Sequence, residues 1–168
     1  MKVIFVALLL ILINSSFTMS IEGVSMIKDT QEETYKPGDI EIITSERAPK
    51  PIGSYSAGTK LHLQGFSIIQ TAGQIGLDPE SGELIEDFDG QVNQAMKNLQ
   101  ALIEDNGGSL KKVTRTELFL SDMANFSKVD KIYSEYFTDH FPARAAVAVK
   151  DLPKYCYFEI MAEAVVQE

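Results

Sequence analysis

The hydrophobic period changes several times along the chain, and the order of these changes is what most constrains the fold. In chain order there are strand-like runs within 41–46 and 61–77, a helical stripe over 92–103, a strand over 113–122, a second helical stripe over 126–137, and strands over 143–149 and 156–166. Gly107-Gly108 ends the first helix, and Pro142 follows the second. This mixture of strands and helices predicts a two-layer α+β domain, with both helices on one face of a single sheet.

The last predicted strand alternates strictly. Every second residue from Cys156 to Ala164 is small or apolar, and the residues between them include Glu159 and Glu163. We therefore expect Cys156 to be a small core residue and not a nucleophile. The other sheet face is also partly apolar, which indicates association through the sheet. His62, on an alternating strand, is expected at the surface.

Composition limits the possible partners. The chain has 168 residues, enough for one ordinary domain, and its formal net charge is −9. Such a charge disfavours binding to a phosphate backbone, so strong nucleic-acid binding is not expected. Its one cysteine, Cys156, and its two histidines, His62 and His140, are too scattered for a zinc motif.

The N-terminal segment is distinct from the domain. In residues 1–20, Lys2 precedes an apolar run from Val3 to Ile13, followed by small and polar residues, which is the layout of a secretory signal. This run is shorter than the roughly 20 residues of a membrane span, although an uncleaved signal anchor stays open. We expect residues 21–40 to be a linker, with a turn at Lys36-Pro37-Gly38, and the domain to cover 41–168.

The predicted location follows from this segment. A functional signal would direct the chain to the secretory pathway or outside the cell, and membrane attachment would require the segment to stay uncleaved. Without a functional signal the chain would be cytoplasmic. Asn125, in the triplet "NFS", would become a glycosylation acceptor on the secretory route. We favour a simpler role for Asn125, as the cap of the second helix.

Arg144 and Glu159 are the charged residues that stand out on the apolar final strands. An arginine fork can hold a carboxylate through two parallel hydrogen bonds, which lysine cannot reproduce. A nearby carboxylate can orient a water molecule and act as a base. The two residues could lie on adjacent strands near one pocket, or they could form a salt bridge with no further role.

Several segments together resemble the RidA/YjgF family, which includes the RutC-like proteins and the reactive-intermediate imine deaminases. The resemblance runs in collinear order over residues 41–168 and leaves out the N-terminal segment. It is carried by "EIITSERAPKPIGSYSAG", "TAGQIGLDPESGEL", the long central segment from "QAMKNLQALIEDNGG" to "VDKIYSEYF", and "FPARAAVAVKDLPKYCYFEIMAEAVV".

The resemblance implies a chorismate-mutase-like fold, with a mixed sheet of about six strands covered on one face by two helices. It also implies a homotrimer with clefts between subunits. Family members hydrolyse 2-imino acids, formed from enamines such as 2-aminoacrylate, to 2-keto acids and ammonia without a cofactor or metal. The alternative is a non-catalytic trimer that binds small carboxylates or a protein partner.

The resemblance also assigns roles to individual residues. Arg144 matches the arginine that grips the substrate carboxylate, and Glu159 matches the acid that positions the attacking water. Tyr55, in "GSYS", matches a tyrosine of the site, and Gly73 and Gln74 match a turn that contacts the substrate.

Four positions depart from the family pattern. Ser54 replaces a proline, Ala72 replaces a serine, Ala146 replaces a frequent cysteine and Ala124 replaces a frequent asparagine. None of them removes the arginine, the acid or the tyrosine. Lower activity or a different substrate size therefore stays open, along with the side chain of the preferred imine.

Overall fold

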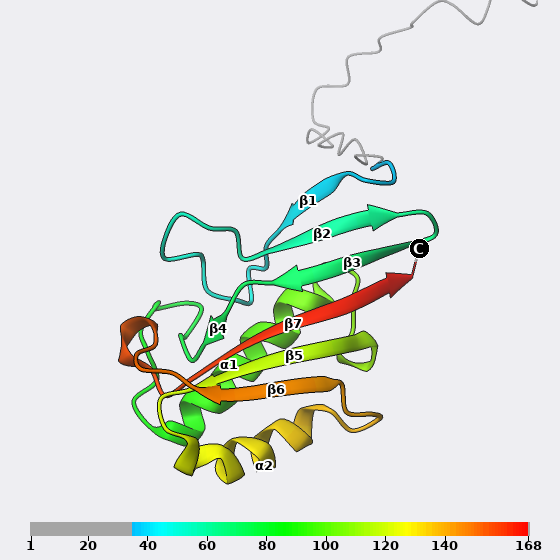
Figure 1. The fold of residues 1–168 in the computed structure, drawn as a ribbon. Coiled ribbons are helices and arrows are strands. Elements are labelled where there is room, and N and C mark those ends of the chain that lie inside the picture. Colours follow the sequence, from blue (N-terminus) through cyan, green and yellow to red (C-terminus); the bar gives the residue numbers. More distant parts are fainter. Residues whose placement is uncertain (1–34, 168) are drawn as a thin grey trace, which may run out of the picture. The chain divides into compact units, whose positions relative to one another are not determined.

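The computed structural model describes residues 35–167, which form a mixed sheet with two α-helices (Figure 1). The strands are β1 (Ile40–Ile43), β2 (Gly58–Leu63), β3 (Phe66–Thr71), β4 (Gln74–Ile75), β5 (Val113–Leu120), β6 (Ala143–Ala148) and β7 (Phe158–Gln167). The helices are α1 (Phe88–Glu104) and α2 (Phe126–Tyr136), and short 3-10 turns cover Leu110–Lys112, Met123–Asn125 and Pro153–Tyr155. The predicted order of strands and helices is confirmed, with the two-residue strand β4 as an addition.

The strands lie in the order β1-β2-β3-β7-β5-β6, and β4 pairs with β7. All pairs are antiparallel except β5 with β6. These two strands are parallel because α2 forms the crossover between them. This arrangement confirms the expected α+β class and the mixed sheet.

Both helices cover the same face of the sheet, as Figure 1 shows, and the hydrophobic core lies between them and the strands. The predicted alternation of β7 is confirmed, because Phe158, Ile160 and Ala164 are fully buried in this core. Cys156 is also buried, as expected. Its burial raises the pKa of the thiol to about 11, so the group is a protonated core side chain near neutral pH.

The second helix does not begin as predicted. Asn125 makes no side-chain capping bond, so the expected cap is wrong. A 3-10 turn precedes the helix, and Asp122 caps that turn by accepting a hydrogen bond from the backbone N–H of Ala124 at 2.8 Å. The turn leads directly into the helix, so the capping position lies three residues earlier than the apolar pattern indicates.

His62 is buried, so the expectation of a surface residue is wrong. Its Nε2 lies 3.0 Å from Glu41 on β1, and its Nδ1 lies 3.2 Å from the hydroxyl of Ser67 on β3. The cause is the strand register, which pairs His62 with Ser67 on the side of the sheet that faces the helices. At this end of the sheet the polar residues lie on the helix side, while Ile40 and Ile42 point the other way.

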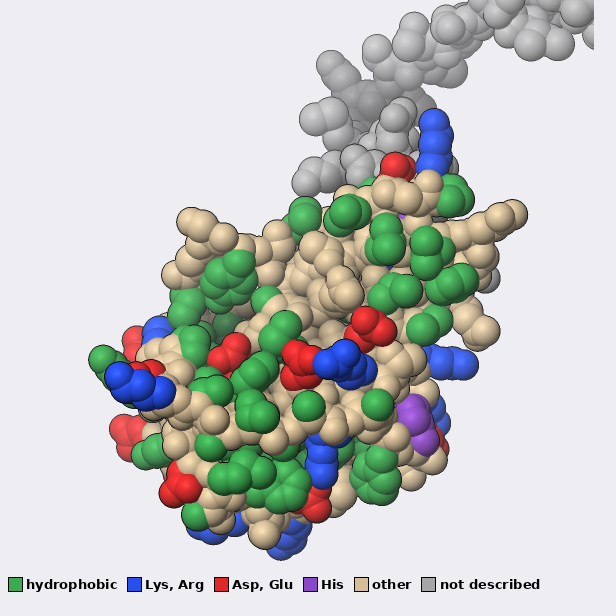
Figure 2. Space-filling model, in the orientation of Figure 1, with side chains coloured by type: hydrophobic (Ala, Val, Ile, Leu, Met, Phe, Trp, Pro, Cys, Tyr) green, Lys and Arg blue, Asp and Glu red, His purple; other side chains and the backbone are tan. Residues whose placement is uncertain are grey.

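Among residues 35–167, no helix covers the sheet face opposite α1 and α2. Ile40 and Ile42 are 65% and 59% exposed on it, and Phe66 and Val147 are also exposed. Figure 2 shows hydrophobic side chains gathered over the ends of β1–β3, and charged side chains across the middle of the face. The partly apolar second face expected from the sequence is therefore present.

The N-terminal predictions for residues 1–20, and most of the predicted linker, lie outside the described residues. The turn at Lys36–Gly38 lies within them and is confirmed, with Gly38 at a φ of 99° and a hydrogen bond from the N–H of Asp39 to the carbonyl of Lys36 at 3.0 Å. Within residues 35–167, no helix is long and apolar enough to cross a membrane.

Candidate functional site

Glu159 lies on the open face of β7, where it pairs with Ile75 of β4 on one side and with Phe119 of β5 on the other. Its carboxylate packs against the backbone of Gly73. A β-carbon at position 73 would overlap Oε1 of Glu159, so only glycine leaves room for this side chain as it stands. The turn before β4 therefore forms one wall of the space that the carboxylate occupies.

Burial raises the pKa of the Glu159 carboxyl above its ordinary value of 4.5. No hydrogen bond or ion pair joins this carboxylate to another residue within 35–167. A half-buried carboxylate whose pKa is raised by loss of water, and which no neighbour neutralises, is a candidate general base.

Glu159 lines a cavity of about 470 Å³, and three other predicted site residues, Tyr55, Gly73 and Gln74, line the same cavity. The structure thus brings together four of the five residues that the sequence singled out. The rest of the lining is mostly apolar and consists of Pro49, Lys50, Pro51, Ile52, Ala57, Ala72, Ile75, Leu77, Pro153 and Met161.

Lys50 supplies the only Lys or Arg side chain among these lining residues, and it was not predicted from the sequence. The signal that could have found it is the proline spacing of "APKPIG", which places a lysine within a stiff loop just before the tyrosine motif. A cation at this position adds positive potential to a cavity that otherwise contains the carboxylate of Glu159.

The side chains of Tyr55 and Gln74 differ in their exposure and in their hydrogen bonds. Tyr55 is 49% exposed, and its hydroxyl accepts a hydrogen bond from the backbone N–H of Ile52 at 3.2 Å, so the hydroxyl can still donate. Gln74 is buried, and its Nε2 donates to the carbonyl of Ala72 at 3.2 Å. Tyr55 is therefore a contact group of the cavity, whereas Gln74 also stabilises the turn that contains Gly73.

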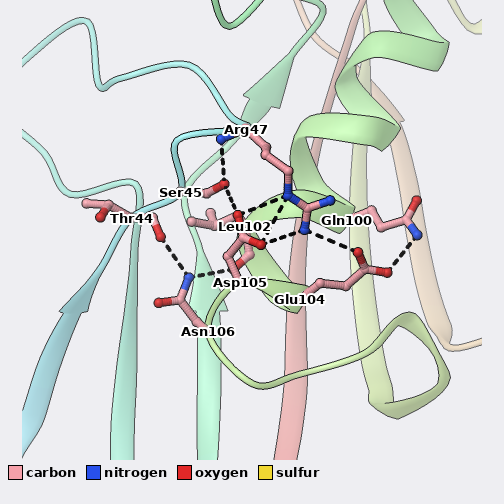
Figure 3. Close-up of polar contacts among 8 residues, drawn as sticks. All are labelled: Thr44, Ser45, Arg47, Gln100, Leu102, Glu104, Asp105 and Asn106. Atoms are coloured by element: carbon pink, nitrogen blue, oxygen red, sulfur yellow. Dashed lines mark hydrogen bonds and ion pairs between the residues drawn. The ribbon is translucent and has the colours of Figure 1, made fainter. Parts of the chain in front are cut away.

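The loop that carries Tyr55 is attached to the end of α1 by an ion-pair cluster around Arg47 (Figure 3). The guanidinium of Arg47 donates to Asp105 from Nη2 at 2.6 Å and from Nε at 3.1 Å, and it also pairs with Glu104 at 3.3 Å. The hydroxyl of Ser45 donates to Asp105 at 2.6 Å. The hydrogen bonds from Arg47 and Ser45 lower the pKa of the Asp105 carboxyl.

A second contact attaches the same loop. The side-chain amide of Asn106 donates to the carbonyl of Thr44 at 2.9 Å and to the carbonyl of Leu102, in the last turn of α1, at 2.7 Å (Figure 3). The start of the loop is therefore held at two points before it runs on to form the cavity wall at 49–55.

Arg144 lies away from this cavity, and the expectation that it sits on a strand adjacent to Glu159 is wrong. Strand β5 separates β6, which carries Arg144, from β7. Thr116 of β5 pairs with Arg144 on one side and with Ala162 on the other. Along the strands, Arg144 is therefore aligned with Ala162 of β7 and not with Glu159. The cause is the parallel crossover through α2, which places β6 at the outer edge of the sheet.

The surroundings of Arg144 are on the helix side of the sheet. Its guanidinium lies over the rings of Phe126 and Tyr133, at 5.2 and 4.8 Å from their centroids. Its Nη1 bonds to the carboxylate of Asp130 at 2.7 Å. The salt bridge with Glu159, considered as the alternative role, is therefore also wrong, because the partner of Arg144 is an acid on α2.

The four departures from the family pattern lie in different places. Ala72 lines the cavity, and Ser54 is exposed in the loop beside Tyr55. Ala146 packs against the core, and Ala124 is exposed in the 3-10 turn before α2. Of the four, Ala72 is the one that changes the shape of the cavity wall directly.

Comparisons with known proteins agree over the domain and leave out the N-terminal segment. A family model described as Endoribonuclease L-PSP matches residues 45–166. A RutC family protein from Pyrococcus abyssi is 42% identical over 125 residues, which are 74% of this chain and 95% of that protein. A 2-iminobutanoate/2-iminopropanoate deaminase from Salmonella typhimurium is 38% identical over 128 residues, which are 74% of this chain and 97% of that protein.

A solved structure supports the same relationship. The crystal structure of Escherichia coli TdcF with bound serine matches with a TM-score of 0.68 and 32% identity, over 74% of this chain and 98% of that one. The family match covers well over half of the chain, and the relatives are matched over nearly their whole length. The chain therefore belongs to the RidA/YjgF family, to which the RutC family proteins also belong.

Proposed function

We propose that the chain hydrolyses 2-imino acids to 2-keto acids and ammonia, and that Glu159 is the base. The observation that carries this proposal is the half-buried Glu159 carboxylate, with its raised pKa, at the wall of a cavity shared with Tyr55. Relatives named as imine deaminases are 37–38% identical to the chain, which supports the same chemistry.

The chemistry needs little beyond a positioned water and a proton carrier. An imine carbon is already electrophilic, so the oxygen of water adds to it while Glu159 takes the proton from water and passes it to the imine nitrogen. The resulting carbinolamine then collapses. Glu159 takes the hydroxyl proton and passes it to the nitrogen, the C–N bond breaks, and the nitrogen departs as ammonia, leaving the 2-keto acid.

We also propose that the substrate carboxylate is held by Arg144 from a second copy of the chain. Within one copy, Arg144 lies two strands away from Glu159 and on the helix side of the sheet, so one copy cannot hold both ends of a small imino acid. The exposed Ile40, Ile42 and Val147 on the open face favour association of copies. A homotrimer with its sites between subunits, as expected from the family resemblance, satisfies both observations.

The location of this reaction is a separate proposal. The layout of residues 1–20 favours entry into the secretory pathway. N-terminal sequencing of the chain recovered from each cell fraction of its native source tests this proposal. An N-terminus within residues 17–21 would support entry with cleavage, and an intact Met1 in the cytosolic fraction would contradict entry.

The function is tested with imines generated in solution by an amino acid oxidase. The rate of 2-keto acid release from 2-iminobutanoate and 2-iminopropanoate is compared between the unsubstituted chain and Arg144→Lys. We expect acceleration over buffer by the unsubstituted chain and a loss of roughly tenfold to a hundredfold in Arg144→Lys, because lysine cannot form the two parallel bonds.

The same experiment separates the two candidate functions. A folded oligomer that binds 2-oxobutanoate but does not accelerate keto-acid release would contradict the enzyme proposal. It would leave a small-carboxylate-binding module as the better description. Analytical ultracentrifugation of the same sample tests the trimer.

A further inference from the structure

Arg144 already has a carboxylate partner within its own chain. Asp130, one turn into α2, bonds to Nη1 of Arg144 at 2.7 Å, and its side chain is 51% exposed. In the proposed function, Arg144 must also receive the carboxylate of the substrate. Two carboxylates would then share one guanidinium group.

We propose that Asp130 is an internal counter-ion that weakens the binding of carboxylates to Arg144 and thereby sets the affinity of the site for its substrate. This inference rests on the part of the proposed function that makes Arg144 the carboxylate clamp. It adds a residue that acts on the substrate through Arg144 and does not need to touch the substrate.

The geometry allows both carboxylates to be bound at once. Asp130 makes its closest approach to Nη1, and no hydrogen bond or second ion-pair partner joins the guanidinium to a residue within 35–167. A guanidinium group has five N–H donors in a planar fork, so a second carboxylate can still form two parallel bonds along the edge made by Nε and Nη2. Asp130 therefore does not block the substrate; it lowers the net positive charge that the substrate meets.

The contact with Asp130 could also orient the guanidinium of Arg144, which would strengthen substrate binding. This effect opposes the repulsion between the two carboxylates. The orientation of the guanidinium is already restricted by the rings of Phe126 and Tyr133, whose centroids lie 5.2 and 4.8 Å from it. Cation–π contacts of this kind hold the group in place without reducing its charge. The remaining effect of Asp130 is then mainly repulsion of a second carboxylate.

The expected size of this effect is modest because Asp130 is half exposed. Two carboxylates on different edges of one guanidinium group lie roughly 7 Å apart, and at an effective dielectric constant of about 40 to 80 their repulsion changes affinity by about threefold to tenfold. Added salt screens the effect.

The test is the full chain with Asp130→Asn, in which the amide keeps the size of the side chain beside Nη1 but the charge is gone. The dissociation constant of 2-oxobutanoate is measured by titration calorimetry at low salt, together with kcat and KM for 2-iminobutanoate. We expect the dissociation constant and KM to fall by about threefold to tenfold, with kcat changed by less than about twofold.

Two further variants isolate the cause. Glu135→Gln removes the same charge from an exposed position of the same helix that forms no ion pair with Arg144 within residues 35–167, and it should leave the dissociation constant unchanged. Asp130→Glu keeps the charge and should leave the affinity close to that of the unsubstituted chain. An equal change in Asp130→Asn and Glu135→Gln would overturn the inference, since it would show a general charge effect.

Weaker or unchanged binding of 2-oxobutanoate in Asp130→Asn would also overturn the inference and would make Asp130 an orienting residue or a bystander. Because binding is measured without turnover, failure of the deaminase proposal is a separate result. If Asp130→Asn binds 2-oxobutanoate more tightly but the unsubstituted chain does not accelerate imine hydrolysis, the counter-ion role is supported and the deaminase proposal is contradicted. If neither the unsubstituted chain nor any variant binds 2-oxobutanoate, both the role of Arg144 as carboxylate clamp and the counter-ion role of Asp130 are contradicted.

Discussion

The carboxylate of Glu159 occupies the space that a side chain at Gly73 would fill. The two residues come from β7 and from the turn before β4, which are separated by more than eighty positions in the chain but are brought together by the pairing of β4 with β7. Strand pairing therefore sets the position of Glu159, and the absence of a β-carbon at position 73 leaves room for its carboxylate.

Replacement of Gly73 by alanine should displace the Glu159 carboxylate and lower kcat for 2-iminobutanoate by at least about tenfold, because small misplacements of a reacting group cost large factors in rate. The measurement is kcat and KM, with circular dichroism to verify the fold. The double variant Gly73→Ala with Glu159→Asp has a shorter acid that leaves room for the methyl group. The added methyl group should therefore reduce activity less in the Glu159→Asp variant than it does in the unsubstituted chain.

Replacement of Glu159 by glutamine should reduce kcat by roughly a hundredfold to ten-thousandfold, the range for loss of a general base. The unsubstituted chain should also lose activity as the pH falls through the raised pKa of Glu159, because only the ionised carboxylate accepts a proton. This acidic limb should lie above pH 4.5, the ordinary value. A pH profile of kcat/KM measures it, and an acidic limb at or below pH 4.5 would contradict the assignment of the base.

Replacement of Arg47 by alanine should loosen the loop that carries Tyr55, because it removes the contacts with both Asp105 and Glu104. We expect KM for 2-iminobutanoate to rise by a few-fold with a smaller change in kcat, since the loop forms a wall of the cavity and does not carry the base. Lys111→Ala removes an exposed ion pair with Asp139 that lies outside the cavity and is the matched control. An equal rise of KM in both variants would contradict a role for the Arg47 cluster in positioning the loop.

Cys156 should resist modification in the folded chain. Its thiol is buried and has a pKa of about 11, so at pH 8 very little thiolate is present and reagents cannot reach it. Treatment with iodoacetamide at pH 8 followed by mass spectrometry should show an unmodified chain, whereas the same treatment in guanidinium chloride should modify one residue. Rapid labelling without denaturant would show that the segment around Cys156 opens.

The order of the elements could be predicted because each signal is local. The apolar stripes of α1 and α2 and the alternation of β7 follow from residues within one element, and all three are present in the structure. Asn125 shows where a local signal is insufficient. A short polar residue before an apolar stripe is typical of a cap, but a 3-10 turn moves the capping role to Asp122.

The class of fold and the burial of Cys156 could be predicted from patterns in the sequence, and the family resemblance added four residues of the cavity wall. Which of the candidate residues lie together depends on contacts between distant strands. Strand order depends on the crossover through α2, and this crossover places β5 between Arg144 and Glu159. It also gives Arg144 a partner, Asp130, that no short-range pattern indicated. Contacts between distant segments arise from pairing and packing across the whole sheet, and these depend on the sum of many weak interactions that no single stretch of sequence contains.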